Sequence, residues 1–168
     1  MMVSAAAYPT KFGCTLPGKQ VLVGSKRVPI KNIFESVNAA KADIENLSVE
    51  QLKSEMAANP DLLVLDLREL QERVDLGTIP GSKHVPRGML EFWADPASPY
   101  YRDYFTEDSR MVVFCAGGGR SVLAVKALED MGFASVAHLE PGFGGWQKAE
   151  EPVEDVSKTS RWVRRERS

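Results

Sequence analysis

The sequence predicts an open α/β fold with a central, mostly parallel sheet. Three short apolar runs, at 62–67, 111–115 and 135–140, have the composition of strands that are buried on both faces. Between the last two runs, residues 120–132 carry apolar side chains at helical spacing. A strand, a helix and a strand in this order imply right-handed crossover connections, which place the strands parallel in one sheet.

The composition of the 168 residues is that of an ordinary globular protein, with 43% apolar and 26% charged residues. A formal net charge of −2 argues against a dedicated nucleic-acid binder, which is strongly basic. The longest apolar run, Met111 to Ala116, is far shorter than the roughly 18 residues that a membrane-spanning helix needs. We therefore expect neither a nucleic-acid partner nor a membrane span.

The cysteine content indicates a reducing compartment. Cys14 and Cys115 are too few for a disulfide framework, and the sequence has no CxxC or Cys/His cluster typical of zinc. The N-terminus has no basic residue before its short apolar stretch, unlike a signal peptide. These observations favour a cytoplasmic protein without metal or cofactor.

The chain divides into three zones. Residues 1–46 form an N-terminal extension with a predicted hairpin and an amphipathic helix at 31–46, which either packs on the flank of the main domain or serves as an oligomerisation arm. Residues 47–152 form the main domain. Residues 153–168 form a charged tail, either solvated or docked on the domain or on a second subunit. A homodimer formed through the extension or the tail is therefore one expectation.

Local signals mark the ends of the predicted helices in the main domain. Ser48 and Gln51 form a capping box that begins a short helix, and Pro60 follows its end. Gly132 suits the position just after the C-terminus of the helix at 120–132.

The residues after the strand at 111–115 concentrate the chemistry. The strand ends in Cys115, which is followed by Ala116, Gly117, Gly118, Gly119, Arg120 and Ser121, where the helix begins. Ligands of open α/β sheets bind at the carboxyl ends of the strands. A glycine-rich loop can curl its backbone N–H groups into an anion-binding nest, and the helix N-terminus and Arg120 add positive charge. Together these effects predict a thiolate at Cys115 without a separate histidine base.

Other interpretations of this loop fit the residues less well. The sequence has no Gly-Lys-Ser/Thr, so the loop is no P-loop, and Val122 stands where a dinucleotide-binding GxGxxG needs its third glycine. The remaining alternative is a buried cysteine that acts only as a small apolar residue. The three glycines, Arg120 and the helix start argue against it.

At these residues the sequence resembles the single-domain rhodaneses, a family of sulfurtransferases. CAGGGRS after an apolar strand is similar to their active-site loop, and VLDLRE (64–69) to their Asp-x-Arg segment. Glu72, GTIPGSKHVP (77–86) and MGFASVAHLEPGFGGW (131–146) match further family segments in the expected order. The resemblance implies a three-layer α/β/α domain; the first 46 residues and the tail show no such likeness.

The resemblance also implies a reaction. In the family, a cysteine thiolate attacks the outer sulfur of an anionic donor such as thiosulfate, releases sulfite and becomes a persulfide. A thiol, cyanide or protein acceptor then takes that sulfur, without a cofactor. By this likeness Cys115 carries the persulfide, the backbone N–H groups of 116–120 hold its charge, and Arg120 attracts the donor.

Two alternatives remain open. Phosphatases and arsenate reductases of related fold use a Cys-x5-Arg loop, whereas Cys115 and Arg120 enclose one residue fewer. The shorter loop should suit a single sulfur better than a phosphoryl group. A sulfur-carrier or binding module without turnover would have the same loop, and a cyanolysis assay distinguishes it.

Further residues are candidates for the cleft. Asp66 and Arg68, at the end of the strand at 62–67, either line it or act structurally, with Arg68 paired to Glu72 and Asp66 tying the following turn. His84 and His138 are predicted to be structural, because two isolated histidines form neither a triad nor a metal set.

The aromatic-rich segment at 87–105 has two interpretations. In one it forms a wall or lid over Cys115, with Trp93 excluding water and Arg87 or Arg102 meeting an anionic donor. In the other, its aromatic side chains complete the core.

Overall fold

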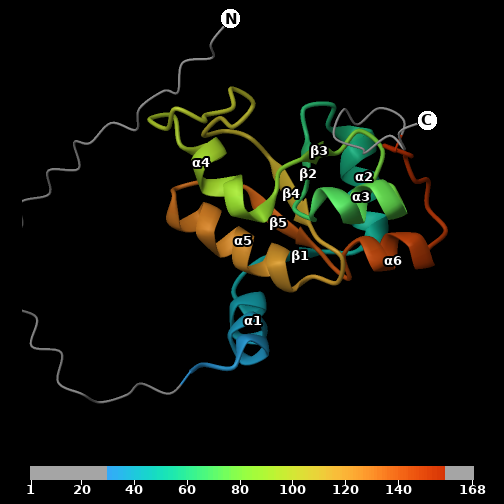
Figure 1. The fold of residues 1–168 in the computed structure, drawn as a ribbon, viewed down its shortest axis with the longest axis horizontal. Helices are drawn as coiled ribbons and strands as arrows, with labels where there is room; N and C mark the ends of the chain where they lie inside the picture. The colour runs from blue at the N-terminus through green and yellow to red at the C-terminus, as the bar shows by residue number, and fades with distance from the viewer. Residues whose placement is uncertain (1–29, 158–168) are drawn as a thin grey trace, which may run out of the picture. The chain divides into compact units, whose positions relative to one another are not determined.

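A computed structural model describes residues 30–157, so the predicted hairpin, Cys14 and the tail beyond residue 157 lie outside the described residues. Its centre is a five-stranded sheet in which all strands are parallel, in the order β1-β5-β4-β2-β3 (Figure 1). The strands are β1 (Glu45–Leu47), β2 (Leu63–Asp66), β3 (Lys83–His84), β4 (Met111–Phe114) and β5 (Val136–Leu139). The predicted parallel sheet is confirmed.

Helices cover both faces of this sheet (Figure 1). One layer holds α1 (Ile33–Ala42), α4 (Leu90–Ala94) and α5 (Gly119–Asp130), and the other holds α2 (Val49–Ala58), α3 (Leu70–Leu76) and α6 (Phe143–Lys148). Side chains alternate between the layers: Leu65 and Val113 pack into a cluster with α5, whereas Val64 and Val112 pack with α2 and α6. The three-layer α/β/α arrangement is thus confirmed. Within residues 30–157, no helix is long and apolar enough to cross a membrane.

The start of α2 and the end of α5 lie where the capping residues in the sequence predict them. At the start of α2, the Ser48 hydroxyl accepts the Gln51 N–H, and the Gln51 side chain accepts the Ser48 N–H. Gly132 follows the end of α5 with a φ of +103°. Local capping chemistry therefore fixes these ends, as expected.

The helix predicted at 31–46 is wrong at its C-terminal end. α1 ends at Ala42, and Glu45–Leu47 instead form the edge strand β1, which pairs with β5. Pairing with a strand already held in the sheet supplies backbone hydrogen bonds that local helical spacing does not reveal. The boundary predicted between residues 46 and 47 falls inside β1.

The first helix lies on the flank of the domain. Val37 and Ala40 of α1 pack against the cluster that contains α5, and Lys41 forms an ion pair with Glu140. These contacts match the interpretation in which the helix packs on the flank of the main domain. Its role in oligomerisation stays a prediction.

A buried ion network joins the end of β2 to the turn after α3. The Asp66 carboxylate accepts hydrogen bonds from the Arg68 guanidinium at 2.7 and 3.0 Å. It also accepts from Arg73 Nε at 3.1 Å and from the Thr78 hydroxyl at 2.7 Å. Asp66 and Arg68 are fully buried, so they hold the core together and line no cleft.

The predicted pairing of Arg68 with Glu72 is wrong. Asp66 and Arg68 are two residues apart in extended chain, so both side chains project to the same face, where the Arg68 guanidinium stacks 3.8 Å from the centre of the Phe143 ring. The prediction that Asp66 ties the turn that follows it is confirmed, because its carboxylate accepts the backbone N–H of Arg68 at 3.0 Å.

Replacing the central carboxylate should destabilise the fold. We expect Asp66→Asn to lower the free energy of unfolding by about 3–5 kcal/mol, because it leaves Arg68 buried without a counter-charge. Asp75→Asn, at an exposed position of α3, is the matched control and should change it by less than about 0.5 kcal/mol. Urea denaturation measures both. A loss below about 1 kcal/mol in Asp66→Asn would show that the network is not needed for stability.

Candidate active site

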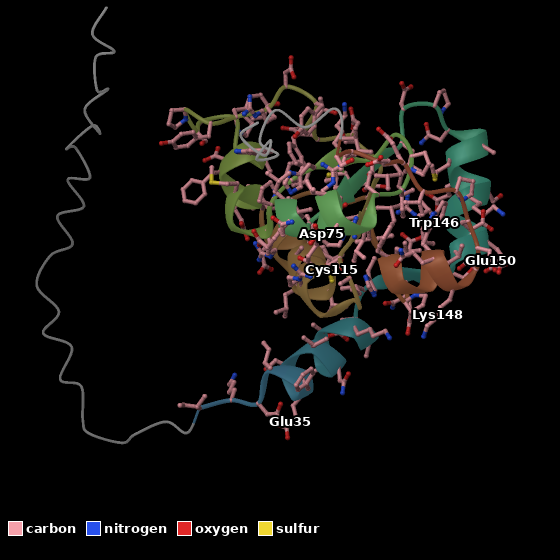
Figure 2. The ribbon with its side chains drawn as sticks, turned by 45° about the vertical axis from the view of Figure 1, so that its right-hand side comes forward. Glu35, Asp75, Cys115, Trp146, Lys148 and Glu150 are labelled. Atoms are coloured by element: carbon pink, nitrogen blue, oxygen red, sulfur yellow. The ribbon has the colours of Figure 1, made fainter. Side chains whose placement is uncertain are left out.

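Cys115 lies directly after β4, between the carboxyl ends of β5 and β2. Its side chain is 2% exposed, and Figure 2 labels it among the surrounding side chains. The helix α5 begins only four residues later, at Gly119. The thiol therefore lies where ligands of parallel sheets bind, next to the positive end of a helix.

Hydrogen-bond donors surround the sulfur. The Gly118 N–H donates to Cys115 Sγ at 3.1 Å, and the Ser121 hydroxyl lies 3.5 Å from it. Gly118 has a φ of +108°, and a Cβ there would lie 3.2 Å from the His138 ring. Because L side chains rarely adopt this conformation, glycine is needed at 118 to bring its N–H to the sulfur.

The balance of burial and hydrogen bonding favours a thiolate. Burial by itself raises the pKa of the Cys115 thiol. The Ser121 hydroxyl and the backbone N–H groups of Ser121, Gly118 and Arg120 outweigh this effect, so that the pKa is lower than that of an ordinary thiol. The predicted loop residues thus act on the sulfur mainly through N–H and O–H dipoles.

The start of α6 holds the other side of the loop. The Phe143 N–H donates to the Cys115 carbonyl at 2.8 Å, and the Gly144 N–H donates to the Ala116 carbonyl at 3.0 Å. Since C=O and N–H point in opposite directions across a trans peptide, the N–H groups of Ala116 and Gly117 point away from α6. The contact with α6 therefore orients the loop.

Ser121 is in turn held by a histidine on β5. His138 Nδ1 lies 3.0 Å from the Ser121 oxygen, and the same hydroxyl lies 2.9 Å from the Gly118 carbonyl. Burial lowers the pKa of His138 to about 4, so its ring is neutral near pH 7. A proton on Nδ1 would donate to the Ser121 oxygen, and the single hydroxyl proton would then be shared between the Gly118 carbonyl and the sulfur. His138, which the sequence predicts to be structural, thus also belongs to the site.

Arg120 is not free to meet a ligand with its whole guanidinium. Its two terminal nitrogens donate to the two carboxylate oxygens of Glu72 at 2.6 and 2.7 Å. Arg120 holds the pKa of Glu72 down to about 2, and Glu72 raises the pKa of Arg120, with a smaller contribution from Cys115. Glu72 is thus a site residue, and its partner is Arg120 rather than the predicted Arg68.

The segment at 87–105 contributes mainly to the core. The aromatic side chains that pack against the apolar cluster are Trp93, Tyr101, Tyr104 and Phe105. Arg87 pairs with Glu91, and the Arg102 guanidinium lies 4.8 Å from the centre of the Trp93 ring. Of the two interpretations of this segment, these contacts favour the core.

Across residues 30–157, no three His, Cys, Asp or Glu side chains are grouped as a metal site.

The sequence model of the rhodanese-like domain family matches residues 48–149. The chain belongs to this family. In the match, the rhodanese-like domain begins at Ser48, the N-cap of α2, and ends just after α6. It therefore contains Cys115, its loop, Glu72 and His138.

The relatives of this rhodanese-like chain are named for sulfur chemistry. A putative sulfurtransferase of Bacillus subtilis, YtwF, is 29% identical over 110 residues, which cover 66% of this chain and 97% of YtwF. The putative sulfur carrier protein YrkF of the same organism is 29% identical over 105 residues, or 62% of this chain. The match spans only 52% of YrkF, so about half of that protein has no counterpart here.

A similar solved structure carries a different description. A protein of unknown function from Rhodopseudomonas palustris, described as a possible tyrosine phosphatase, is 41% identical with a TM-score of 0.71. The match covers 78% of this chain and all of that one. Phosphatase activity therefore has to be weighed against sulfur transfer.

The Ser121 hydroxyl should set part of the acidity of the thiol. We expect Ser121→Ala to raise the midpoint of the pH dependence of Cys115 alkylation by roughly one unit, because the thiolate loses a donor. In the wild type the midpoint should lie below the ordinary thiol value of about 8.5. Ser54→Ala, at an exposed position of α2, is the control. Equal midpoints in all three proteins would mean that Ser121 does not act on the sulfur.

The close approach of α6 to the loop gives a second test. A Cβ on Gly142 would lie 2.7 Å from the Cys115 carbonyl oxygen, whereas a Cβ on Gly81 meets no atom within 4 Å, although both residues have a φ of +77°. We expect Gly142→Ala to cost at least about 2 kcal/mol more unfolding free energy than Gly81→Ala and to slow alkylation of Cys115. Equal costs, measured by denaturation, would show that the contact with α6 is unimportant.

Proposed function

We propose that this rhodanese-like protein is a sulfurtransferase that carries sulfane sulfur as a persulfide on Cys115. The Cys115 thiolate attacks the outer sulfur of a donor, here written for thiosulfate. The bond between the two donor sulfurs breaks, sulfite leaves with the electron pair, and Cys115 becomes a persulfide anion. The total charge is unchanged, and no redox cofactor or metal takes part.

The observation that carries this proposal is a buried sulfur surrounded by hydrogen-bond donors. A thiolate that lies 3.1 Å from the Gly118 N–H can attack without a base to remove its proton. After transfer, the negative charge lies one sulfur further from Cys115. The N–H groups of Ala116 and Gly117 have no partner among the hydrogen bonds of the described chain, and they are suited to hold that charge.

The second half-reaction returns the thiolate. An acceptor such as a thiol, cyanide or a sulfur-accepting protein attacks the outer sulfur of the persulfide, the S–S bond breaks, and Cys115 keeps the electron pair. With cyanide the product is thiocyanate. After each half-reaction the enzyme form that results is stable until the other substrate binds, so we expect ping-pong kinetics. We propose the same chemistry in the cytoplasm, with a thiol or a protein as the acceptor.

Phosphatase activity is the second candidate, because the Rhodopseudomonas palustris protein is described as a possible tyrosine phosphatase. Two features of this chain weigh against it. The loop between Cys115 and Arg120 holds four residues, one fewer than the phosphatase pattern. In addition, Glu72 occupies both terminal nitrogens of Arg120, which a phosphoryl group would need for bidentate binding.

The two candidates separate in one set of assays. We expect the wild type to form thiocyanate from thiosulfate and cyanide, and Cys115→Ser to lose this activity at least about a thousandfold, because a serine hydroxyl is not ionised near pH 7. Cys14→Ser, the other cysteine, is the control and should keep it. Hydrolysis of an aryl phosphate by the wild type that disappears in Cys115→Ser, without thiocyanate formation, would assign the protein to the phosphatases instead. A persulfide that forms on Cys115 but never turns over would indicate a sulfur carrier.

A further inference from the structure

We propose that a cavity at the edge of the sheet where β4 and β5 begin binds a small organic cation, namely an amine with an aromatic body. The cavity has a volume of about 540 Å³, which is typical of small-molecule sites. Its lining comprises residues 94–96, 101, 105–107 and 131–133. The inference concerns a second site and does not depend on the Cys115 reaction.

The cavity lies at the end of α5 that is remote from the cysteine loop. α5 begins at Gly119, next to that loop, and the residues 131–133 that follow its last turn line the cavity. Its 12 helical residues span about 18 Å. The other walls come from the end of α4 and from the segment that precedes β4. A small ligand in this cavity therefore does not contact the sulfur.

Buried aromatic side chains line the cavity. Phe105 and Phe133 are both buried, and their ring centres are 6.3 Å apart. The Tyr101 hydroxyl donates to the Phe105 carbonyl and so holds this wall in place. Met131 adds a thioether that is partly exposed at the cavity, and such a group contacts aromatic rings favourably. These walls shield an apolar body from water, and their ring faces attract a cation.

The charged side chains among the described residues that line the cavity are both acidic. They are Asp95 and Glu107. Within residues 30–157, Asp95 accepts one hydrogen bond, from the Ala97 N–H at 2.8 Å, and Glu107 has no ion-pair partner. Both carboxylates are therefore available to a ligand.

The surrounding elements add to this negative charge. α4 and α5 both end at the cavity, and the C-terminal end of a helix carries partial negative charge. The nearest basic groups are already engaged: Lys126 pairs with Glu129, and the Arg102 guanidinium lies over the Trp93 ring. The local field therefore favours a cation over a neutral or anionic molecule of the same shape.

An aromatic amine fits both features of the cavity. Its ring packs against Phe105 and Phe133, and its ammonium group, which is protonated near pH 7, approaches Asp95 and Glu107. A bare metal ion fits less well, because no third acidic, histidine or cysteine side chain joins these two carboxylates among the described residues. Binding is non-covalent, so no bond forms or breaks.

The test is isothermal titration calorimetry of the full-length protein with three probes of similar shape: 2-phenylethylamine, 2-phenylethanol and phenylacetate. Asp95→Asn combined with Glu107→Gln removes both charges and keeps an oxygen that can accept the Ala97 N–H. Asp75→Asn combined with Glu35→Gln is the matched control. It changes the net charge equally, at exposed positions on α3 and α1 that Figure 2 labels.

We expect the wild type and the control to bind the amine at least about tenfold more tightly than the alcohol or phenylacetate. The Asp95→Asn, Glu107→Gln protein should bind the amine about tenfold more weakly and the alcohol with unchanged affinity. Met131→Lys places a positive charge at the cavity. It should weaken binding of the amine and strengthen binding of phenylacetate.

Three results would overturn the inference. They are no binding of the amine to the wild type, equal affinities for the three probes, and unchanged amine binding in the Asp95→Asn, Glu107→Gln protein. Cys115→Ser should bind the amine as the wild type does, and a loss there would place the amine at the cysteine loop and also refute the inference. None of these measurements involves sulfur transfer, so failure of this inference leaves the proposed function intact.

Discussion

A buried sulfur whose negative charge has to be stabilised without water is the constraint on which the proposed activity depends. The Cys115 side chain is only 2% exposed, so water cannot solvate its thiolate. Burial alone would raise the pKa of the thiol and keep it protonated. The loop replaces water with fixed donors, chiefly the Gly118 N–H and the Ser121 hydroxyl. Because these dipoles are already oriented, they can stabilise the thiolate without rearrangement, and in the proposed reaction they would do the same for the persulfide.

The fold supplies the rigidity that these donors need. β4 lies inside a five-stranded sheet and delivers Cys115 to its carboxyl edge, while α5 begins at the loop. The start of α6 binds the Cys115 and Ala116 carbonyls, and β5 brings His138 to Ser121. The buried network around Asp66 ties β2 to the segment that precedes β3. β4, α5, α6 and β5 therefore all contribute to the position of one sulfur atom.

Local sequence patterns predicted the parts of the structure that local chemistry determines. The apolar runs gave β2, β4 and β5, the capping box gave the start of α2, and the glycines after Cys115 gave an N–H nest. The parts that were missed depend on long-range pairing. β1 forms because it meets β5, and Glu72 pairs with Arg120, 48 positions away, while Arg68 takes Asp66. No spacing rule shows which of several carboxylates an arginine will meet.

The most direct test of the account is the mass of the Cys115 peptide after incubation with a sulfur donor and removal of the excess. The donors are thiosulfate and an alkyl hydropersulfide, used separately. We expect one added sulfur atom on this peptide, which is lost on addition of cyanide with formation of an equal amount of thiocyanate. An unchanged Cys115 peptide with both donors, or added sulfur on the Cys14 peptide instead, would contradict it.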